Sequence, residues 1–135
     1  MKRESLPVTR AAITKKFELI ERVPEETLPN GTVRESYTRP LSIYFTVGCY
    51  PDGRMGELFI KTDRAGSFVS GALEGVAIQI SLALQHGIDL HVLIDKLRGM
   101  KFAPDGFTGD PDVPSCTSVL DLLAKWLMLK FPAPK

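Results

Sequence analysis

The feature that most constrains the fold is a run of strictly alternating residues at positions 41–49, followed by a turn and a second apolar run. The run reads Leu-Ser-Ile-Tyr-Phe-Thr-Val-Gly-Cys, so every second side chain is apolar, which is the period of a strand with one buried face. Pro51-Asp52-Gly53 then supplies a turn, because proline presets φ and glycine accepts a positive φ. The sequence therefore predicts an antiparallel β-hairpin over residues 41–62.

A third strand is expected upstream of this hairpin. In residues 11–22, Ile13, Phe17 and Leu19 share one parity while Lys15 breaks it, a pattern that favours an edge strand. Residues 24–36 carry two prolines and an Asn-Gly pair, which are typical of a loop or a loose hairpin.

The second half of the chain predicts three helices. Residues 67–86 are apolar around most of the helical circumference, so we expect a long, central and largely buried helix with Ser67 as its N-cap. Residues 89–99 predict a second helix, begun by Asp89 and ended by Gly99. A third begins at Ser118, where Asp121 three residues later resembles a capping box.

These elements predict a single α+β domain over residues 1–135. We expect an antiparallel sheet of about three strands, followed by three helices packed on one face. The core should span about residues 11–128, with residues 1–8 and 131–135 loose. An exposed edge of the sheet would make a homodimer plausible.

Composition excludes several classes of function. The net charge of +1 gives no global field that favours nucleic acid or membrane. Neither Cys49 nor Cys116 belongs to a metal-binding pattern such as CxxC, and no apolar segment follows the basic start of the chain. We therefore expect a cytoplasmic protein with reduced thiols, no metal, no membrane and no strong tie to nucleic acid.

The long loop at residues 101–117 is the first candidate site. It exceeds the roughly two to eight residues that usually join packed helices, and Phe102 and Phe107 favour a packed loop over a disordered one. Its carboxylates, Asp105, Asp110 and Asp112, do not have calcium-loop spacing, and turn formation explains most of them.

The junction between the hairpin and the long helix is the second candidate site. Lys61, Arg64, Gly66 and Ser67 lie together there, and a helix N-terminus with two cations suits a phosphate group. A capped helix with solvated charges explains the same residues and is the favoured interpretation.

Three further side chains have weaker claims to function. His86 and His91 have no third ligand beside them in the sequence, so metal binding is disfavoured. Cys116 as a nucleophile would need a base and an oxyanion hole, and the sequence supplies neither. A packed thiol is the favoured interpretation.

Residues 11–128 resemble the TSCPD domain, which occurs near the C-terminus of adenosylcobalamin-dependent (class II) ribonucleotide reductases and as short free-standing proteins. The resemblance rests on Gly56-Glu57, Phe59-Ile60-Lys61, the Gly66-Ser67 helix start, "SLALQHGIDLHVLIDKLRGMKF" and "GFTGDP". The matching loop and helix-start residues are Phe102, Gly106, Phe107, Thr108, Thr117, Ser118 and Asp121.

The sequence departs from the family pattern at cysteine positions. The name-giving motif has Val119 and Leu120 where the family has cysteine and proline, and Phe102 stands where a second cysteine is often found. Reductase C-terminal domains commonly lack these cysteines too, so the resemblance is better to that branch. A thiol or metal role of the cysteine-bearing branch does not transfer to this chain.

The resemblance implies a non-catalytic accessory or regulatory module that binds a protein partner, such as a reductase catalytic subunit, or a nucleotide. Reductase chemistry needs a radical-generating cofactor and several cysteines in a large barrel, and Cys49 with Cys116 cannot supply them. Adenosylcobalamin therefore enters by family context alone, and we expect no cofactor in this chain. A piece of a split reductase and a repurposed, phage-type inhibitor are the alternatives.

Overall fold

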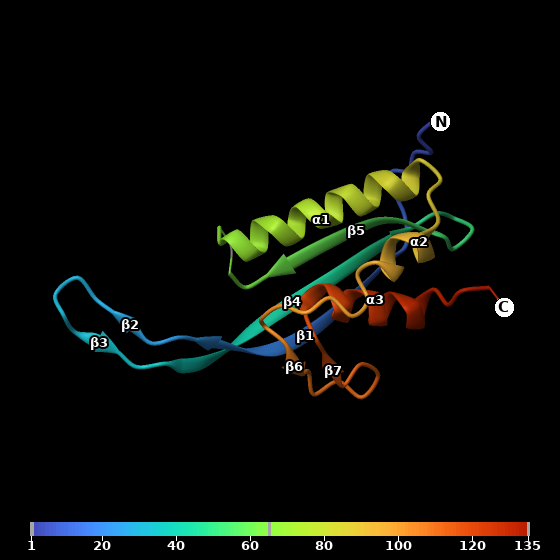
Figure 1. Cartoon of the computed structure of the whole chain (residues 1–135). Helices are drawn as coiled ribbons and strands as arrows, with labels where there is room; N and C mark the ends of the chain where they lie inside the picture. The colour runs from blue at the N-terminus through green and yellow to red at the C-terminus, as the bar shows by residue number, and fades with distance from the viewer. Residues whose placement is uncertain (1, 65, 135) are drawn as a thin grey trace.

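A three-stranded antiparallel sheet forms the centre of the fold. The computed structural model describes residues 2–64 and 66–134. The strands are β1 (Ala12–Val23), β4 (Tyr37–Cys49) and β5 (Met55–Thr62), in the spatial order β1-β4-β5 (Figure 1). The predicted hairpin and edge strand are therefore confirmed. Gly53, with a φ of 92°, closes the hairpin turn in the left-handed region that favours glycine.

The strand register puts the alternating apolar side chains on one face of the sheet, which we call the inner face. Phe17 pairs with Ile43, and Phe45 pairs with Ile60, so β1, β4 and β5 all direct apolar side chains to the same side. These side chains are almost fully buried. The opposite face carries Tyr44 and Phe59, both partly exposed, and we call it the open face.

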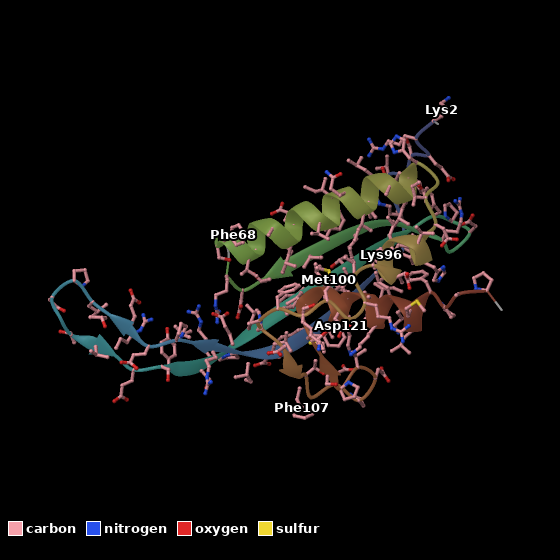
Figure 2. The ribbon with its side chains drawn as sticks, in the orientation of Figure 1. Lys2, Phe68, Lys96, Met100, Phe107 and Asp121 are labelled. Carbon is pink, nitrogen blue, oxygen red and sulfur yellow. The ribbon has the colours of Figure 1, made fainter. Side chains whose placement is uncertain are left out.

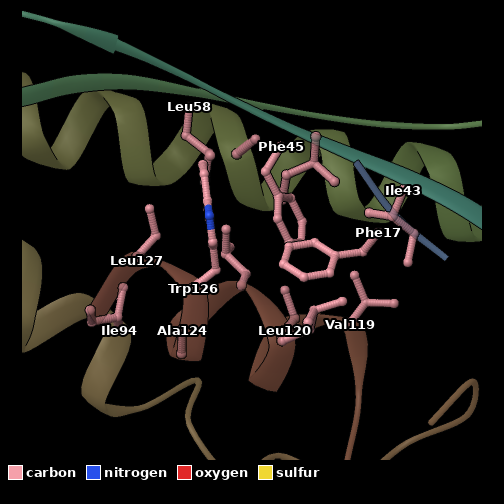
Figure 3. Close-up of a cluster of buried hydrophobic side chains, with 14 of the residues drawn as sticks. Phe17, Ile43, Phe45, Leu58, Ile94, Val119, Leu120, Ala124, Trp126 and Leu127 are labelled. Carbon is pink, nitrogen blue, oxygen red and sulfur yellow. The ribbon is translucent and has the colours of Figure 1, made fainter. Parts of the chain in front are cut away.

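Helix α3 (Val119–Lys130) covers the inner face and is the true centre of the core. The rings of Phe45 and Trp126 stack with their centroids 5.8 Å apart, and Phe17 lies against Phe45 at the same centroid distance (Figure 3). Short helix α2 (Leu90–Asp95) packs against α3 and adds Ile94 to the cluster. The α+β class, with a three-stranded antiparallel sheet and three helices, is confirmed.

Helix α1 (Phe68–Gln85) lies along the outer edge of β5 rather than in the middle of the domain (Figure 1). The Ser81 hydroxyl accepts the Leu58 N–H at 2.8 Å and donates to the Leu58 carbonyl at 3.2 Å. The Gln85 side chain donates to the Gly56 carbonyl at 2.9 Å. The backbone groups of Leu58 and Gly56 that make these bonds point away from β4. Side chains of α1 therefore bind the free edge of β5, where a fourth strand could otherwise pair.

The prediction that α1 is largely buried is wrong. Leu73, Ala77 and Ile80 enter the core, but Phe68 is 89% exposed and Ile78 is 50% exposed. The helix is apolar on the outside as well as the inside, and apolar composition alone does not say which side is covered. Among the described residues, α1 alone has the length and hydropathy of a membrane span, yet its bonds to β5 hold it against the sheet.

The β1–β4 ribbon continues beyond the helices as an arm, which we define as residues 20–40. Near its tip, β2 (Glu26–Thr27) pairs with β3 (Val33–Arg34). Figure 1 shows this arm extending away from the helices, with no helix packed on it. The stretch predicted as a loop or loose hairpin is thus a hairpin tip.

The N-terminal segment has defined contacts although residues 1–8 were expected to be loose. The Arg54 guanidinium pairs with Glu4, at 2.8 Å to Oε2, and the Tyr50 hydroxyl donates to the Glu4 carbonyl at 2.8 Å. Arg3 donates to the Gln85 side chain at 2.6 Å. Local sequence patterns do not predict these contacts, because they join positions about 50 and 80 residues apart.

If α3 is the centre of the core, two leucines of this helix should differ sharply when truncated. Leu123 is fully buried, so Leu123→Ala should lower the free energy of unfolding by about 2–5 kcal/mol. Leu129 is 56% exposed, so Leu129→Ala should cost less than about 0.5 kcal/mol. Urea denaturation followed by the fluorescence of Trp126 measures both, and equal losses would contradict the placement of α3.

Candidate functional site

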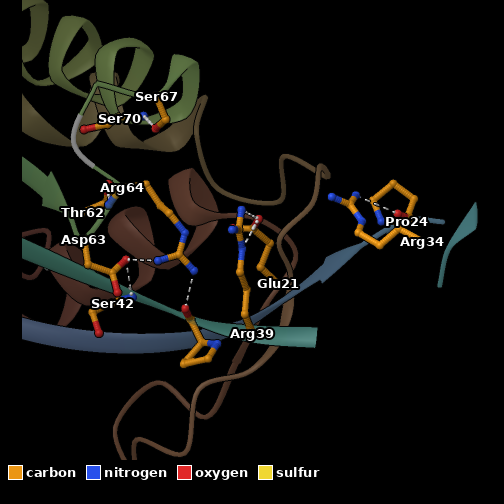
Figure 4. Close-up of polar contacts among 11 residues, drawn as sticks. Glu21, Pro24, Arg34, Arg39, Ser42, Thr62, Asp63, Arg64, Ser67 and Ser70 are labelled. Atoms are coloured by element: carbon orange, nitrogen blue, oxygen red, sulfur yellow. Dashed lines mark hydrogen bonds and ion pairs between the residues drawn. The ribbon is translucent and has the colours of Figure 1, made fainter. Parts of the chain in front are cut away.

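The predicted phosphate junction is present, but its side chains are largely occupied by the protein itself. Arg64 donates to the Pro40 carbonyl at 2.6 Å and to the Asp63 carboxylate at 3.1 Å, and Figure 4 shows Arg64 beside Asp63. The Ser67 hydroxyl accepts the Ser70 N–H at 3.1 Å, which is an N-cap. These bonds fit the simpler interpretation of a capped helix, and a phosphate site here stays a prediction.

Lys61 belongs to a different surface. It projects from the open face of β5 and lines a groove of about 400 Å³ between β5 and α1. Glu57 and Glu74 line the same groove, as do the apolar side chains of Phe59 and Ile78. Arg3 also lines the groove, so two cations face two carboxylates and the groove has no excess positive charge for a phosphate group.

Both histidines serve local structure. His86 caps the end of α1, and its Nδ1 lies 2.8 Å from the Leu82 carbonyl. His91 has Nδ1 3.1 Å from Asp89 and Nε2 2.6 Å from the Phe131 carbonyl, which connects α2 to the end of α3. Within residues 2–64 and 66–134, no three acidic, histidine or cysteine side chains gather in a way that could hold a metal ion.

The name-giving motif builds a structural clasp around the buried carboxylate of Asp121. Its Oδ1 accepts the Gly99 N–H at 2.7 Å, and its Oδ2 accepts the Thr117 N–H at 2.9 Å and lies 2.9 Å from Lys125. Ser118 caps α3 by accepting the Asp121 N–H at 3.0 Å. Figure 2 places Asp121 and Met100 close together in the body of the domain, and the Thr117 hydroxyl donates to the Met100 carbonyl at 2.7 Å.

This clasp fixes the charge of Asp121. Burial by itself would raise the pKa of its carboxyl, but the two backbone N–H bonds and Lys125 outweigh burial and hold the pKa below its usual value. Asp121 is therefore ionised at neutral pH and joins the start of α3 to both ends of the loop that precedes it. The residues that carry the family motif hold the fold together at this point.

The long loop is packed, but not by the two phenylalanines that suggested it. Phe107 is 85% exposed, and Figure 2 shows it pointing away from the body. Val113 and Cys116 are buried instead, within a small hairpin of β6 (Gly106–Phe107) and β7 (Ser115–Cys116), and Pro104 is buried ahead of that hairpin. The prediction that Phe107 packs is wrong because the hairpin tip turns it to solvent.

Asp110 explains why Lys15 breaks the parity of β1. The Lys15 ammonium lies 2.5 Å from the Asp110 carboxylate, so the loop covers the inner face of β1 with an ion pair. Asp110 also accepts the N–H groups of Asp112 and Val113, and the bond with Lys15 is the largest cause that lowers its pKa. Asp110 therefore has the turn-forming role expected for the loop carboxylates. It also pairs with Lys15, which lies far away in the sequence.

The open face carries a partly buried ion pair that the sequence does not predict. The Glu57 carboxylate is almost fully buried and receives the Arg10 guanidinium on both oxygens, at 3.0 Å from the Arg10 terminal nitrogen to Oε1. Hydrogen bonding to Glu57 raises the pKa of Arg10. The Glu57 side chain lies directly over Gly48, where a Cβ would come within 2.6 Å of its Cγ. Gly56-Glu57 signals this arrangement in the sequence, but its partners are 8 to 47 positions away.

The two thiols are buried in separate places. Cys49 ends β4 and Cys116 lies in β7, and burial raises the pKa of each thiol. A raised pKa reduces the thiolate fraction that a nucleophile or a redox pair needs. The packed-thiol interpretation of Cys116 agrees with this burial.

The described residues thus define a small α+β domain whose motif residues build structure. The TSCPD domain family matches residues 16–131, and the chain belongs to this family. It is 35% identical over 139 residues to a vitamin B12-dependent ribonucleotide reductase of Rhodopirellula baltica, and 34% identical over 140 residues to one of Streptomyces coelicolor. Each alignment covers 96% of this chain.

The chain spans a small part of these relatives. It covers 13% of the Rhodopirellula baltica reductase and 14% of the Streptomyces coelicolor reductase. A vitamin B12-dependent ribonucleotide reductase of Agrobacterium fabrum is 32% identical over 112 residues, which are 9% of its length. No solved structure matches the chain.

Removing the charge of Asp121 should open the clasp. Asp121→Asn turns an amide N–H₂ toward a backbone N–H, so we expect a loss of about 2–3 kcal/mol in the free energy of unfolding. Because the folded pKa is lowered, the wild-type stabilisation should be complete above the unfolded value of about 3.9 and fall at lower pH. Asp112→Asn, at an exposed position, is the control. Equal stability of the two variants would show that the clasp is unimportant.

A methyl group at Gly48 should disturb the ion pair of Glu57 with Arg10. Gly48→Ala forces Glu57 to move away from its Arg10 partner, and we expect a destabilisation of about 1–3 kcal/mol. Gly71→Ala is the matched control, because its Cβ would meet nothing and alanine favours helix by up to about 1 kcal/mol. Thermal unfolding of both variants should give shifts of opposite sign, and a neutral Gly48→Ala would contradict the packing.

Proposed function

We propose that this chain is a non-catalytic module of vitamin B12-dependent ribonucleotide reduction and that it binds the catalytic part of a reductase through its arm. The relatives support the first half, because the chain resembles about an eighth of proteins named vitamin B12-dependent ribonucleotide reductase. The separate, buried thiols of Cys49 and Cys116 support a role without radical or disulfide chemistry in this chain.

The exposed apolar surface of the arm supports the proposal that the arm binds a partner. Ile20, Val33 and Tyr37 are exposed on a two-stranded ribbon that no helix covers. An isolated two-stranded ribbon is marginally stable in water, so a covering partner would stabilise it. A partner that covers these side chains would bury apolar area that no helix of the described chain covers.

Ion pairs keep the arm in one shape before it meets a partner. Arg39 donates to Glu21 at 2.7 Å across the β1–β4 pair, and Arg34 lies 2.9 Å from Glu26 across the tip. The Arg34 guanidinium also lies over the Tyr37 ring, 5.5 Å from its centroid. Such cross-strand pairs order the ribbon and reduce the entropy lost on binding.

A binding measurement tests this proposal. Biolayer interferometry should detect binding of the chain to the Rhodopirellula baltica reductase from which the matching 13% has been removed. The double variant Ile20→Asp/Val33→Asp should weaken this binding at least about tenfold, because it puts charge on the apolar surface. Val92→Asp, at an exposed position on α2, is the control.

Three outcomes would contradict the proposal. The wild-type chain would fail to bind, the arm variant would bind as tightly as wild type, or the chain alone would turn over ribonucleotides with adenosylcobalamin and dithiothreitol. The first outcome would favour an inhibitor or an unrelated interaction protein, and the last would favour a catalytic piece of a split reductase.

A further inference from the structure

The outer edge of β1 carries unpaired backbone groups. Just before this strand, the Ala11 carbonyl accepts the Cys49 N–H at 3.0 Å, so the backbone groups of the odd-numbered residues in β1 face β4. The groups of the even-numbered residues therefore point out of the sheet. Within the part of the chain that the structure describes, no other strand pairs with β1 on that side. Four residues with outward groups are exposed: Thr14, Lys16, Glu18 and Ile20.

The chain itself binds the outward groups of the other two strands. Ser81 and Gln85 of α1 bind the outer edge of β5. Where β4 continues past the end of β5, it presents Pro40, which has no N–H, and the Pro40 carbonyl accepts the Arg64 guanidinium at 2.6 Å. An edge strand whose N–H and carbonyl groups stay unbound is a template for another strand.

We propose that β1 pairs with β1 of a second copy of this chain, antiparallel about a two-fold axis at Phe17, so that two sheets become one. In this register Lys16 lies opposite Glu18 of the second copy, and Thr14 lies opposite Ile20. All four have outward backbone groups, so each pair exchanges two hydrogen bonds, and the two-fold axis repeats each pair. Residues 14–20 thus supply about eight backbone hydrogen bonds, close to the roughly ten of a typical interface.

The order of charges on β1 points to a second copy in this register. Overlap of the two strands is greatest when the axis lies near the middle of Ala12–Val23. An axis at Lys16 would put two ammonium groups opposite each other, and an axis at Glu18 would put two carboxylates together, which is unfavourable. An axis at Phe17 instead pairs opposite charges twice. Charges on an edge strand ordinarily discourage pairing, but these disfavour the two neighbouring registers and favour this one.

This pairing leaves the tips of both arms free. The two β1 strands run in opposite directions, so the arms leave the paired segment at opposite ends. Val33 and Tyr37 of each arm lie beyond the paired residues 14–20 and stay available to another partner. The inference therefore does not rest on the proposed reductase partner, and the purified chain alone is sufficient to test it.

A charge swap tests the register. Sedimentation equilibrium of the whole chain, from low micromolar to near-millimolar concentration, should show a monomer–dimer equilibrium. Lys16→Glu should raise the dissociation constant at least about fivefold, because carboxylates would face each other in two places, and Glu18→Lys should do the same with ammonium groups. The double variant Lys16→Glu/Glu18→Lys restores opposite charges and should bind nearly as wild type. Lys2→Glu, on the α1 side of the domain in Figure 2, should leave the equilibrium unchanged.

A proline tests whether the backbone takes part. Glu18→Pro removes an outward N–H, and proline is tolerated on an edge strand where this group faces solvent, so the fold should be retained, as thermal unfolding can verify. It should weaken the dimer more than Glu18→Thr, which removes the same charge and keeps the N–H.

Hydrogen exchange gives a second measurement that needs no variant. The amides of Lys16 and Glu18 should gain protection as the concentration of wild type passes the dissociation constant. A wild-type chain that stays monomeric at near-millimolar concentration would overturn the proposal. A dimer whose outward amides gain no protection, or a double charge variant as weak as the single ones, would also overturn it.

Discussion

The structure depends on the burial of the inner face of the sheet beneath α3. Phe45 and Trp126 stack at its centre, and neighbours from all three strands close around them. This contact is made between segments about 80 residues apart, so α3 can contribute only after the chain between them has been arranged. The buried carboxylate of Asp121 makes that arrangement definite, because it binds the backbone at Gly99 and Thr117 and so holds the two ends of the loop beside the start of α3. Helix α3 thus carries both the apolar packing through Trp126 and the polar contacts of Asp121.

Local patterns in the sequence predicted the elements well. Strict alternation with a Pro-Asp-Gly turn is sufficient for the β4–β5 hairpin, and Ser67 and Ser118 are capping residues whose bonds stay within four positions. The burial of α1 was predicted wrongly for a physical reason. Hydrophobicity records how much a side chain gains by leaving water, but not whether this chain or another molecule removes the water.

The sequence likewise predicts some features of the candidate site and not others. The motif around Asp121 could be found from the sequence, but its meaning as a clasp needed the positions of Gly99 and Met100. The Arg10–Glu57 pair could not be predicted, because Gly56-Glu57 marks the position but its partners Gly48 and Arg10 lie 8 and 47 positions away. Arg64 shows what the sequence leaves out: a cation near a helix start suggests phosphate, but its bonds to the Pro40 carbonyl and to Asp63 depend on tertiary structure.

The bonds of Ser81 and Gln85 to β5 limit how this sheet can grow. An edge strand ordinarily recruits another strand through its free N–H and carbonyl groups, whether in crystals, in domain-swapped oligomers or in fibres. In this domain, side chains of α1 bind the outward groups of Leu58 and Gly56, so β5 is closed to that kind of addition. A further strand would have to pair with β1, at the opposite edge. There the ion pair between Lys15 and Asp110 of the loop already covers part of the inner face. The two edges of the sheet therefore differ: α1 covers the β5 edge, and another chain could add a strand only at the β1 edge.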